Sequence, residues 1–369
     1  MLYYLAEFIN RKLHPAGFDI FKYITWRSAL AAITAMFISF WLGPKILKKL
    51  NEDKIADEIR DDGPKTHLVK AGTPTMGGVI ILLSILVPVI FWSDLKNTYI
   101  LIILLSTIWM GIVGFIDDYL KVFKKLKKGL VGKYKLLNQI SLGVVVACLI
   151  YFLPEFKNIN TITTIPFLKN VEFDFSFYYI PIMVFIITAT SNAVNLTDGL
   201  DGLAIGCVGI SAMALAVISY ISGNEIYARY LNIIYLPGNG ELTIYCAAVV
   251  GASLGFLWFN SYPAQVIMGD TGALALGGAI GTLTILVKKE FLLPILGGIF
   301  FAEAISVILQ RLYFKYTKKR YGEGRRVFKM APLHHHFEML GVPEPKIVTR
   351  FYIVAVILAI VTFATFKVR

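Results

Sequence analysis

Long apolar runs recur along almost the whole chain, and they restrict its fold more than any other feature. A helix needs about 20 consecutive apolar residues to cross a hydrocarbon core of roughly 30 Å. Hydrophobic residues make up 57% of the chain and charged residues 16%, whereas soluble domains carry roughly a quarter charged residues. The apolar runs lie at about 23–43, 75–92, 97–117, 135–153, 177–195, 202–221, 242–259, 264–287, 291–313 and 347–366. The sequence therefore predicts an all-α polytopic membrane protein with about ten transmembrane helices.

The loops between these runs contain no hydrophilic stretch long enough for a separate soluble domain, so we expect residues 1–369 to form a single integral-membrane domain. Lysine and arginine are concentrated in the loops 44–74, 118–135 and 314–346. Ten spans put these three loops on one face, which the positive-inside rule makes cytoplasmic. Both termini are then predicted to be periplasmic.

The net charge of +12 follows the same pattern. Because the basic residues lie in alternate loops, topology, anionic membrane lipid and phosphate binding account for them, and no nucleic-acid partner is expected.

Acidic residues gather at the face that the charge pattern makes cytoplasmic. They are Asp117, Asp118, Asp198, Asp201 and Asp270. The two loops that carry the last three contain no lysine or arginine. Carboxylates beside lipid need a compensating cation, and Mg²⁺ suits them because it takes carboxylate oxygens together with substrate phosphates. We therefore expect an active site at this face.

Other interpretations of these acids stay open at this point. Asp117 and Asp118 also fit a simple helix end, and residues 192–202 fit a polar turn with Asx caps. A cation-coupled transporter also places acids in membrane helices. Transporters usually hold such acids near the bilayer midplane and have repeated halves, whereas this chain has no visible repeat.

Two further groups of polar residues adjoin this face. Lys70 precedes a stretch of small residues that includes Thr75, where a loop backbone and a cation can approach phosphate oxygens. The consecutive histidines His334, His335 and His336 cannot all point the same way, which makes a tridentate zinc site a poor interpretation. Hydrogen bonding or phosphate contact suits one or two of them better, and an inert surface position is the alternative.

Five stretches together resemble the polyprenyl-phosphate N-acetylhexosamine-1-phosphate transferase family. They are Lys70–Gly78, Gly114–Lys121, Asn192–Gly206, Ala264–Gly272 and Ala331–Glu338. They extend across most of the chain. The His-His-His-Phe-Glu run at 334–338 favours the muramoyl-pentapeptide branch over relatives that transfer other sugars.

The resemblance implies transfer of phospho-MurNAc-pentapeptide from UDP-MurNAc-pentapeptide to undecaprenyl phosphate. The products would be lipid I and UMP, and the reaction would be the first membrane step of peptidoglycan synthesis. It also implies a Mg²⁺ cofactor, a bacterial cytoplasmic (inner) membrane location and a homodimer. A related transferase that takes UDP-GlcNAc is the alternative, which a panel of sugar nucleotides would separate.

The resemblance also implies roles for single residues. Asp270 would be the Mg²⁺ ligand, and Asp117, supported by Asp118, would act on the lipid phosphate as a base or orienting group. Attack by the lipid phosphate itself is favoured, and a two-step route through an aspartate nucleophile stays open. The implied substrate contacts are Lys70, Thr75, Lys121 and Lys133 around the phosphates, Asn195, Asp198, Asp201 and Gln310 around the nucleoside, and His334, His335 and His336 at phosphate or sugar.

The chain departs from the family pattern at one position. Ile267 occupies the place before Met-Gly-Asp where the family commonly has phenylalanine. An aliphatic side chain can cover the uracil ring but lacks aromatic stacking, worth roughly 0.5–1.5 kcal/mol.

Overall fold

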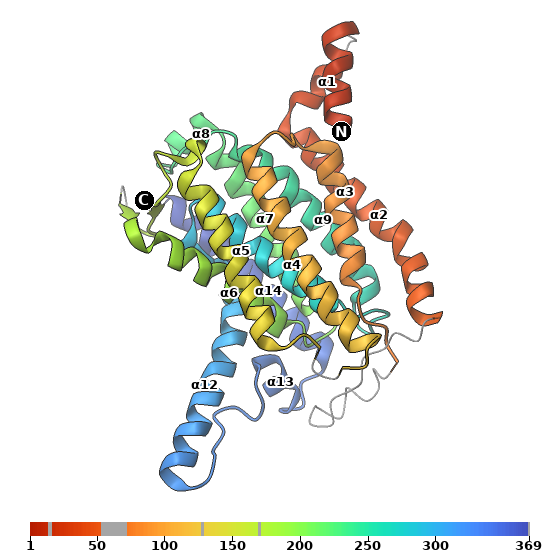
Figure 1. The fold of residues 1–369 in the computed structure, drawn as a ribbon, viewed down its shortest axis with the longest axis vertical. Coiled ribbons are helices and arrows are strands. Elements are labelled where there is room, and N and C mark those ends of the chain that lie inside the picture. Colours follow the sequence, from red (N-terminus) through yellow and green to blue (C-terminus); the bar gives the residue numbers. More distant parts are fainter. Residues whose placement is uncertain (14–16, 53–71, 127–128, 169–170, 368–369) are drawn as a thin grey trace.

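The computed structural model describes residues 1–13, 17–52, 72–126, 129–168 and 171–367. Helices account for most of this chain (Figure 1). The α-helices are α1 Leu2–Leu13, α2 Ile24–Glu52, α3 Gly78–Trp92, α4 Thr98–Val122, α5 Gly132–Phe152, α6 Tyr179–Thr197, α7 Leu203–Ser222, α8 Glu225–Tyr230, α9 Leu242–Asn260, α10 Gly269–Leu286, α11 Leu293–Leu296, α12 Gly298–Tyr321, α13 Leu333–Glu338 and α14 Glu344–Lys367. Short 3₁₀ helices are η1 Phe18–Lys22, η3 Pro154–Phe156, η4 Ser176–Tyr178, η5 Asn239–Glu241 and η6 Glu290–Leu292, and the strands β1 Ile162–Thr164 and β2 Glu172–Asp174 form an antiparallel pair.

Each predicted apolar run coincides with helical structure. Among the described residues, eight helices are long and apolar enough to cross a membrane: α2, α4, α5, α6, α7, α9, α10 and α14. Helix α3 is also apolar but has 15 residues, about 23 Å at 1.5 Å per residue, which is shorter than a hydrocarbon core. The predicted class, an all-α polytopic membrane protein, is confirmed.

The ninth predicted run is not one straight helix. Residues Glu290–Leu296 and α12 meet at 82°. Pro294 lies in the first turn of the short helix α11, which begins at Leu293, and Gly297 and Gly298 lie at the bend itself. Proline and paired small residues are the usual causes of such breaks. Beyond the bend, α12 continues to Tyr321 and projects from the body of the molecule (Figure 1).

Small residues let several helices approach closely, as their spacing in the sequence predicts. A Cβ on Gly251 of α9 would lie 2.1 Å from the carbonyl oxygen of Ala32 in α2. A Cβ on Gly277 of α10 would lie 2.7 Å from the Cα of Ser191 in α6. The glycines are therefore required where backbone packs against backbone.

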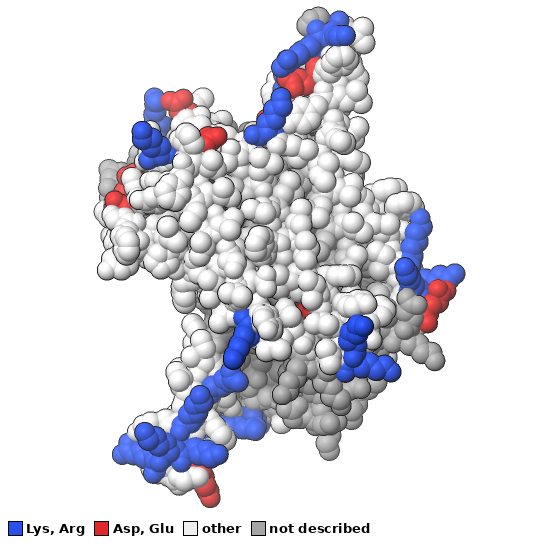
Figure 2. Space-filling view, viewed as in Figure 1, with Lys and Arg blue, Asp and Glu red and all other residues white. Residues whose placement is uncertain are grey.

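The two ends of the molecule differ in what they carry. Both termini and the β1–β2 pair lie toward one end, whereas α13 and the projecting part of α12 lie at the other (Figure 1). Figure 2 shows lysine and arginine side chains along α12 and at both ends, with a band between them that is almost free of charge on this face. The uncharged band matches the apolar surface that a bilayer requires. Placing the termini in the periplasm remains a prediction from loop charge.

Candidate active site

The first turn of α10 is the centre of the acidic cluster. Asp270 is the second residue of this helix and follows Gly269, whose φ of +74° lies in the left-handed region. Asp118 of α4 accepts hydrogen bonds from the backbone N–H of Asp270 (3.1 Å), and from the N–H (2.9 Å) and hydroxyl (2.6 Å) of Thr271. A carboxylate at a helix N-terminus satisfies free N–H groups and interacts favourably with the helix dipole. Asp118 therefore caps α10 and orients Asp270.

Two lysines bridge the carboxylates of Asp117 and Asp270. Lys121 Nζ lies 2.7 Å from Asp117 Oδ2 and 3.2 Å from Asp270 Oδ2. Lys135 Nζ, from the first turns of α5, lies 2.9 Å from Asp117 Oδ1 and 2.5 Å from Asp270 Oδ2. The backbone N–H of Leu130 donates to Asp117 Oδ1 at 2.7 Å. The site thus combines buried carboxylates with ammonium groups from two helices.

Helix α6 supplies the polar groups on the other side of Asp270. Asn195 Nδ2 donates to Asp270 Oδ1 at 2.8 Å. Asp198 follows the last residue of α6. Desolvation, together with the negative charges of Asp270 and Asp118, raises the pKa of Asp198 to about 7. Its carboxyl group therefore holds a proton more tightly than a solvated aspartate.

Two glycines allow the surrounding helices to reach the start of α10. A Cβ on Gly114 of α4 would lie 2.2 Å from the carbonyl oxygen of Asp270. A Cβ on Gly78 of α3 would lie 2.1 Å from the backbone nitrogen of Gly272. Both neighbours are backbone atoms, which cannot move aside as a flexible side chain would. These close contacts bring Asp117 and Asp118 next to Asp270.

The donor set fits a hard divalent cation. Asp117, Asp118 and Asp270 can each offer one carboxylate oxygen, and these oxygens lie within 4.8 Å of one another. Asp117 Oδ2 is buried, and among the described residues its close contact is the 2.7 Å ion pair with Lys121. Mg²⁺ binds through one or two carboxylates plus substrate phosphates. Because Asp118 is already used as a cap, Asp117 and Asp270 are the better placed ligands.

Residues before α3 border the cluster. Thr75 is buried, and its Oγ1 is 3.1 Å from the position of a Cβ on Gly269. The N–H of half-buried Ile267 donates to the Pro74 carbonyl at 2.8 Å, and its own carbonyl accepts from Gly77 at 3.0 Å. The backbone around Ile267 is therefore fixed against the segment that carries Thr75.

Gln310 and two histidines hold the loop that follows α12. The Gln310 amide accepts hydrogen bonds from Val327 and Phe328 N–H, each at 3.0 Å, and donates to the Phe328 carbonyl at 3.1 Å. His336 Nδ1 accepts from the Lys329 N–H at 3.1 Å, and His335 Nδ1 pairs with Glu338 Oε2 at 2.7 Å. Gln310 thus pins this loop, and its amide is engaged with backbone.

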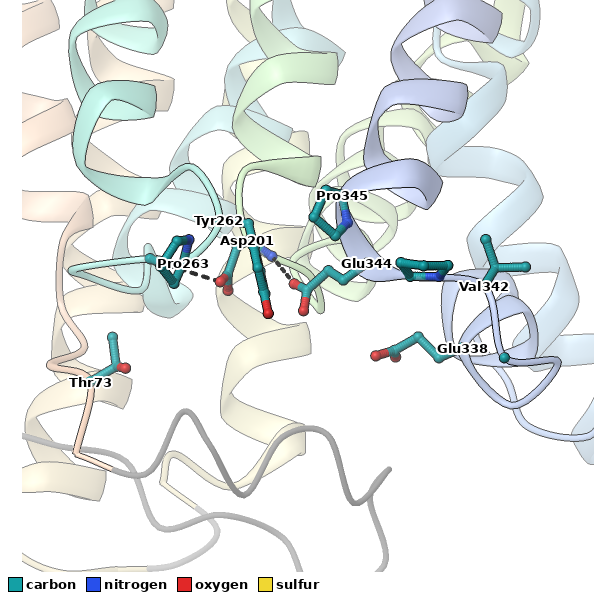
Figure 3. A pocket seen from close by; sticks show the side chains of 11 residues that line it. Thr73, Asp201, Tyr262, Pro263, Glu338, Val342, Glu344 and Pro345 are labelled. Carbon is teal, nitrogen blue, oxygen red and sulfur yellow. Dashed lines mark hydrogen bonds between the residues drawn. The ribbon is translucent and has the colours of Figure 1, made fainter.

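Asp201 lines a cavity of about 400 Å³ beside the start of α14. Its N–H donates to Glu344 Oε1 at 2.7 Å, and its Oδ2 accepts from the Ala264 N–H at 3.0 Å. Figure 3 shows Asp201 and Glu344 facing each other, with Glu338 across the cavity. Asp201 therefore ties the 198–202 loop to α14 and to the loop before α10.

The predicted lysines are placed differently from one another. Lys70 lies outside the described residues, and Lys133 is exposed in the first turn of α5. Lys135 contacts both carboxylates but was not among the residues that the sequence singled out. The sequence showed it only as one of many lysines in a basic loop.

His334 is fully buried and packs against Gly199.

The chain is also similar to known proteins over its whole length. The family model Glycosyl transferase family 4 matches residues 100–288, and phospho-N-acetylmuramoyl-pentapeptide-transferase signature 1 matches residues 70–82. The phospho-N-acetylmuramoyl-pentapeptide-transferase of Chloroherpeton thalassium is 50% identical over 369 residues, covering 100% of both chains. This chain is also similar to two other proteins of that name. The one from Thermodesulfovibrio yellowstonii is 50% identical over 369 residues, covering 100% of this chain and 99% of the relative, and the one from Salinibacter ruber is 48% identical over 385 residues, covering 100% of both. The chain belongs to the phospho-N-acetylmuramoyl-pentapeptide-transferase family.

Proposed function

We propose that this protein transfers phospho-MurNAc-pentapeptide from UDP-MurNAc-pentapeptide to undecaprenyl phosphate, forming lipid I and releasing UMP. The observation that carries the proposal is the cluster in which Lys121 and Lys135 bridge Asp117 and Asp270 at the ends of membrane helices. Phosphoryl transfer depends on positioning and charge neutralisation rather than on elaborate covalent chemistry. The curated relatives carry the name of this activity.

The surroundings of the cluster suit one lipid and one water-soluble substrate. An apolar groove of about 550 Å³ lies between α4 and α5, lined by residues such as Trp109, Ile112 and Leu130. It reaches the cluster, because the N–H of Leu130 donates to Asp117. The cavity beside Asp201 (Figure 3) lies on the side of the 198–202 loop. The groove offers a lipid phosphate a route from the bilayer, and the cavity offers room for a soluble donor.

The reaction forms one P–O bond and breaks another. An oxygen of the lipid phosphate attacks the sugar-linked phosphorus of the donor, and the bond from that phosphorus to the UMP oxygen breaks. A phosphate monoester has its second pKa near 6, so the nucleophile is already largely ionised at neutral pH. Lys121 and Lys135 would hold and neutralise the phosphates. Asp117 would orient these lysines, which makes a positioning role more suitable for it than a nucleophilic one.

Asp270 and Asp117 would hold Mg²⁺, with Asp118 fixing the orientation of Asp270. When bound, the ion would neutralise negative charge on the pyrophosphate and on the departing UMP. Asn195 would keep the Asp270 carboxylate in place through its hydrogen bond. The carboxylates, the lysines and the ion together make a site for two phosphorylated substrates.

The remaining assignments belong to the same proposal. Lys70 and exposed Lys133 would attract phosphate at the edge of the site, and Thr75 and Ile267 would border the nucleotide. Asp198, Asp201 and Gln310 would shape the nucleoside pocket, and His335 and His336 would meet the sugar or phosphate. We also propose a bacterial inner-membrane location, a single domain over 1–369 and a homodimer.

Release of UMP by purified protein in detergent or lipid tests the proposal. UMP should appear when UDP-MurNAc-pentapeptide, undecaprenyl phosphate and Mg²⁺ are all present, and omission of any one should abolish it. UDP-GlcNAc in place of the muramoyl donor is the matched control and should give no product. A preference for UDP-GlcNAc would move the chain to the related sugar specificity, and no UMP with either donor would refute the proposed function.

A further inference from the structure

Glu303 of α12 is a buried carboxylate that the chemistry described above does not use. Its side chain has no exposed surface. Within the described residues, no lysine or arginine forms an ion pair with it. Its neighbours that can carry a charge are His334 and the buried thiol of Cys207. Burying a carboxylate is costly unless hydrogen bonds or an opposite charge compensate. The groups that contact Glu303 therefore show what it stabilises.

Glu303 contacts the beginning of α13. Its two carboxylate oxygens accept from the backbone N–H of His334 at 3.2 and 3.4 Å, and His334 Nδ1 lies 3.3 Å from Oε1. Pro332, at the N-cap of α13, provides no side-chain hydrogen bond. The first N–H groups of a helix need acceptors from outside the helix. Glu303 supplies one of them and fixes the backbone of His334, while the buried ring nitrogen Nδ1 lies beside the Glu303 carboxylate without a hydrogen bond among the described residues.

The ring of His334 in turn packs against Gly199. A Cβ on Gly199 would lie 2.1 Å from His334 Nε2, so only glycine leaves room for the ring. The ring is fully buried, and a ring without exposed surface cannot meet a substrate directly. This differs from the role that the sequence resemblance implied for His334.

Gly199 connects the ring to the active site. It follows Asp198, and α6 ends at Thr197. Asn195, in the last turn of α6, donates to the Asp270 carboxylate at 2.8 Å. A shift of His334 would therefore move the end of α6, together with the groups that surround Asp270.

We infer that Glu303 and His334 are positioning residues of the transfer reaction. Glu303 holds the backbone at the start of α13, which places the His334 ring against Gly199, and the ring holds the end of α6 so that Asn195 and Asp198 stay beside Asp270. Glu303 lies just beyond the 82° break before α12, so the pair also couples the projecting helix to the site. The catalytic part of this inference rests on the proposed function, whereas the contact with the α6 end does not.

The test compares two substitutions of the same kind. Glu303→Gln keeps an acceptor for the His334 N–H but removes the charge beside its ring. Glu290→Gln is the matched control, because Glu290 is also buried, lies before the break and is bonded by Thr163 in β1 rather than by the site. Gly199→Ala, which displaces the ring from the other side, is a second variant that leaves Glu303 intact.

Hydrogen exchange of residues 195–202 is the readout that does not depend on activity. Exchange should be faster in Glu303→Gln and Gly199→Ala and unchanged in Glu290→Gln. In the UMP assay, Glu303→Gln should raise the KM for the donor about tenfold, the usual scale for a lost charged hydrogen bond, and leave the KM for the lipid acceptor unchanged. A Glu303→Gln, His334→Gln pair should be non-additive, since the two residues act as a unit.

If residues 195–202 exchanged hydrogen at the wild-type rate in Glu303→Gln, the inference would be overturned. So would equal changes in both KM values, because these indicate a general loss of structure. If wild-type protein releases no UMP, the proposed function fails, and the exchange experiment alone decides whether Glu303 positions the α6 end.

Discussion

The carboxylate of Asp118 accepts a hydrogen bond of 3.1 Å from the backbone N–H of Asp270, the residue whose side chain both active-site lysines contact. One aspartate therefore orients another through the first turn of α10. Asp117, its neighbour in α4, instead faces Lys121 and Lys135. Adjacent residues on a helix point about 100° apart. Asp118 therefore caps α10, while Asp117 pairs with the lysines.

Asp118→Asn tests the capping role. The amide keeps one acceptor oxygen but loses the negative charge at the helix N-terminus, which should cost about 0.5–2 kcal/mol of stability. Because Asp270 is then less well oriented, the Mg²⁺ concentration for half-maximal UMP release should rise about 10–100-fold, as for other outer-shell partners of metal ligands. Asp94→Asn, at the other end of the molecule, is the control. If Asp118→Asn needed the same Mg²⁺ concentration as wild type for half-maximal UMP release, the role of Asp118 in orienting Asp270 would be contradicted.

Lys135 and Lys133 provide a matched pair of substitutions. Lys135 lies between two carboxylates, whereas Lys133 is exposed. Lys135→Gln should lower kcat/KM by about tenfold or more, the scale of a lost charged hydrogen bond. Lys133→Gln removes the same charge from the same end of α5 and should change kcat/KM far less. Steady-state kinetics decide between them, and a larger effect at Lys133 would reverse the assignment.

Gly114→Ala tests the close approach of α4 to α10. The added methyl group would lie 2.2 Å from the Asp270 carbonyl oxygen. Overpacking of this kind typically costs about 1–3 kcal/mol, and here it also displaces Asp270. We expect a lower melting temperature and reduced UMP release. Gly132→Ala, with nothing within 4 Å of the added atom, should change neither. Unchanged stability in Gly114→Ala would show that the helices are not packed this tightly.

Asp198→Asn should change how stability depends on pH. The site raises the pKa of the Asp198 carboxyl group from 3.8 to about 7. A raised native pKa gives stability that is complete below the unfolded value and is lost as pH rises toward the native value. Wild-type stability should therefore lose this contribution between about pH 4 and 7, and the asparagine variant should not.

Melting temperatures measured from pH 5 to 8 without Mg²⁺ check this expectation. The difference between Asp198→Asn and wild type should grow up to about pH 7 and then level off. Asp174→Asn is the control, because hydrogen bonds from Thr161 and Ser176 lower the pKa of Asp174 and keep it ionised throughout this range. A pH-independent difference for Asp198→Asn would contradict the raised pKa.

Sequence periodicity and length were enough to predict the membrane class and the end of α4 that carries Asp117. They could not predict the break before α12, since Pro294, Gly297 and Gly298 also occur in continuous membrane helices. The distinction between Lys133 and Lys135 depends on where α5 begins. Two residues apart on a helix, they point about 200° apart, so only one can reach the carboxylates.

Glu303 was missed although the chain carries a signal for it. It is an acidic residue inside the apolar run 291–313, and an ionisable residue in a membrane span is a functional candidate by default. Its partner His334 lies in α13, 31 residues later in the chain, and no local pattern relates the two. Only the folded chain brings Glu303, His334 and Gly199 together.

The most direct test of the central claim, that transfer takes place where Asp270 and the lysines meet, is the initial rate of UMP release by wild-type and Asp270→Asn protein. Both should be assayed with UDP-MurNAc-pentapeptide, undecaprenyl phosphate and saturating Mg²⁺, after comparison of their melting temperatures. Asp270→Asn should fold but lose at least about 100-fold in rate, the scale for loss of a group that stabilises transition-state charge. Wild-type rate and Mg²⁺ dependence in a folded Asp270→Asn variant would contradict the account.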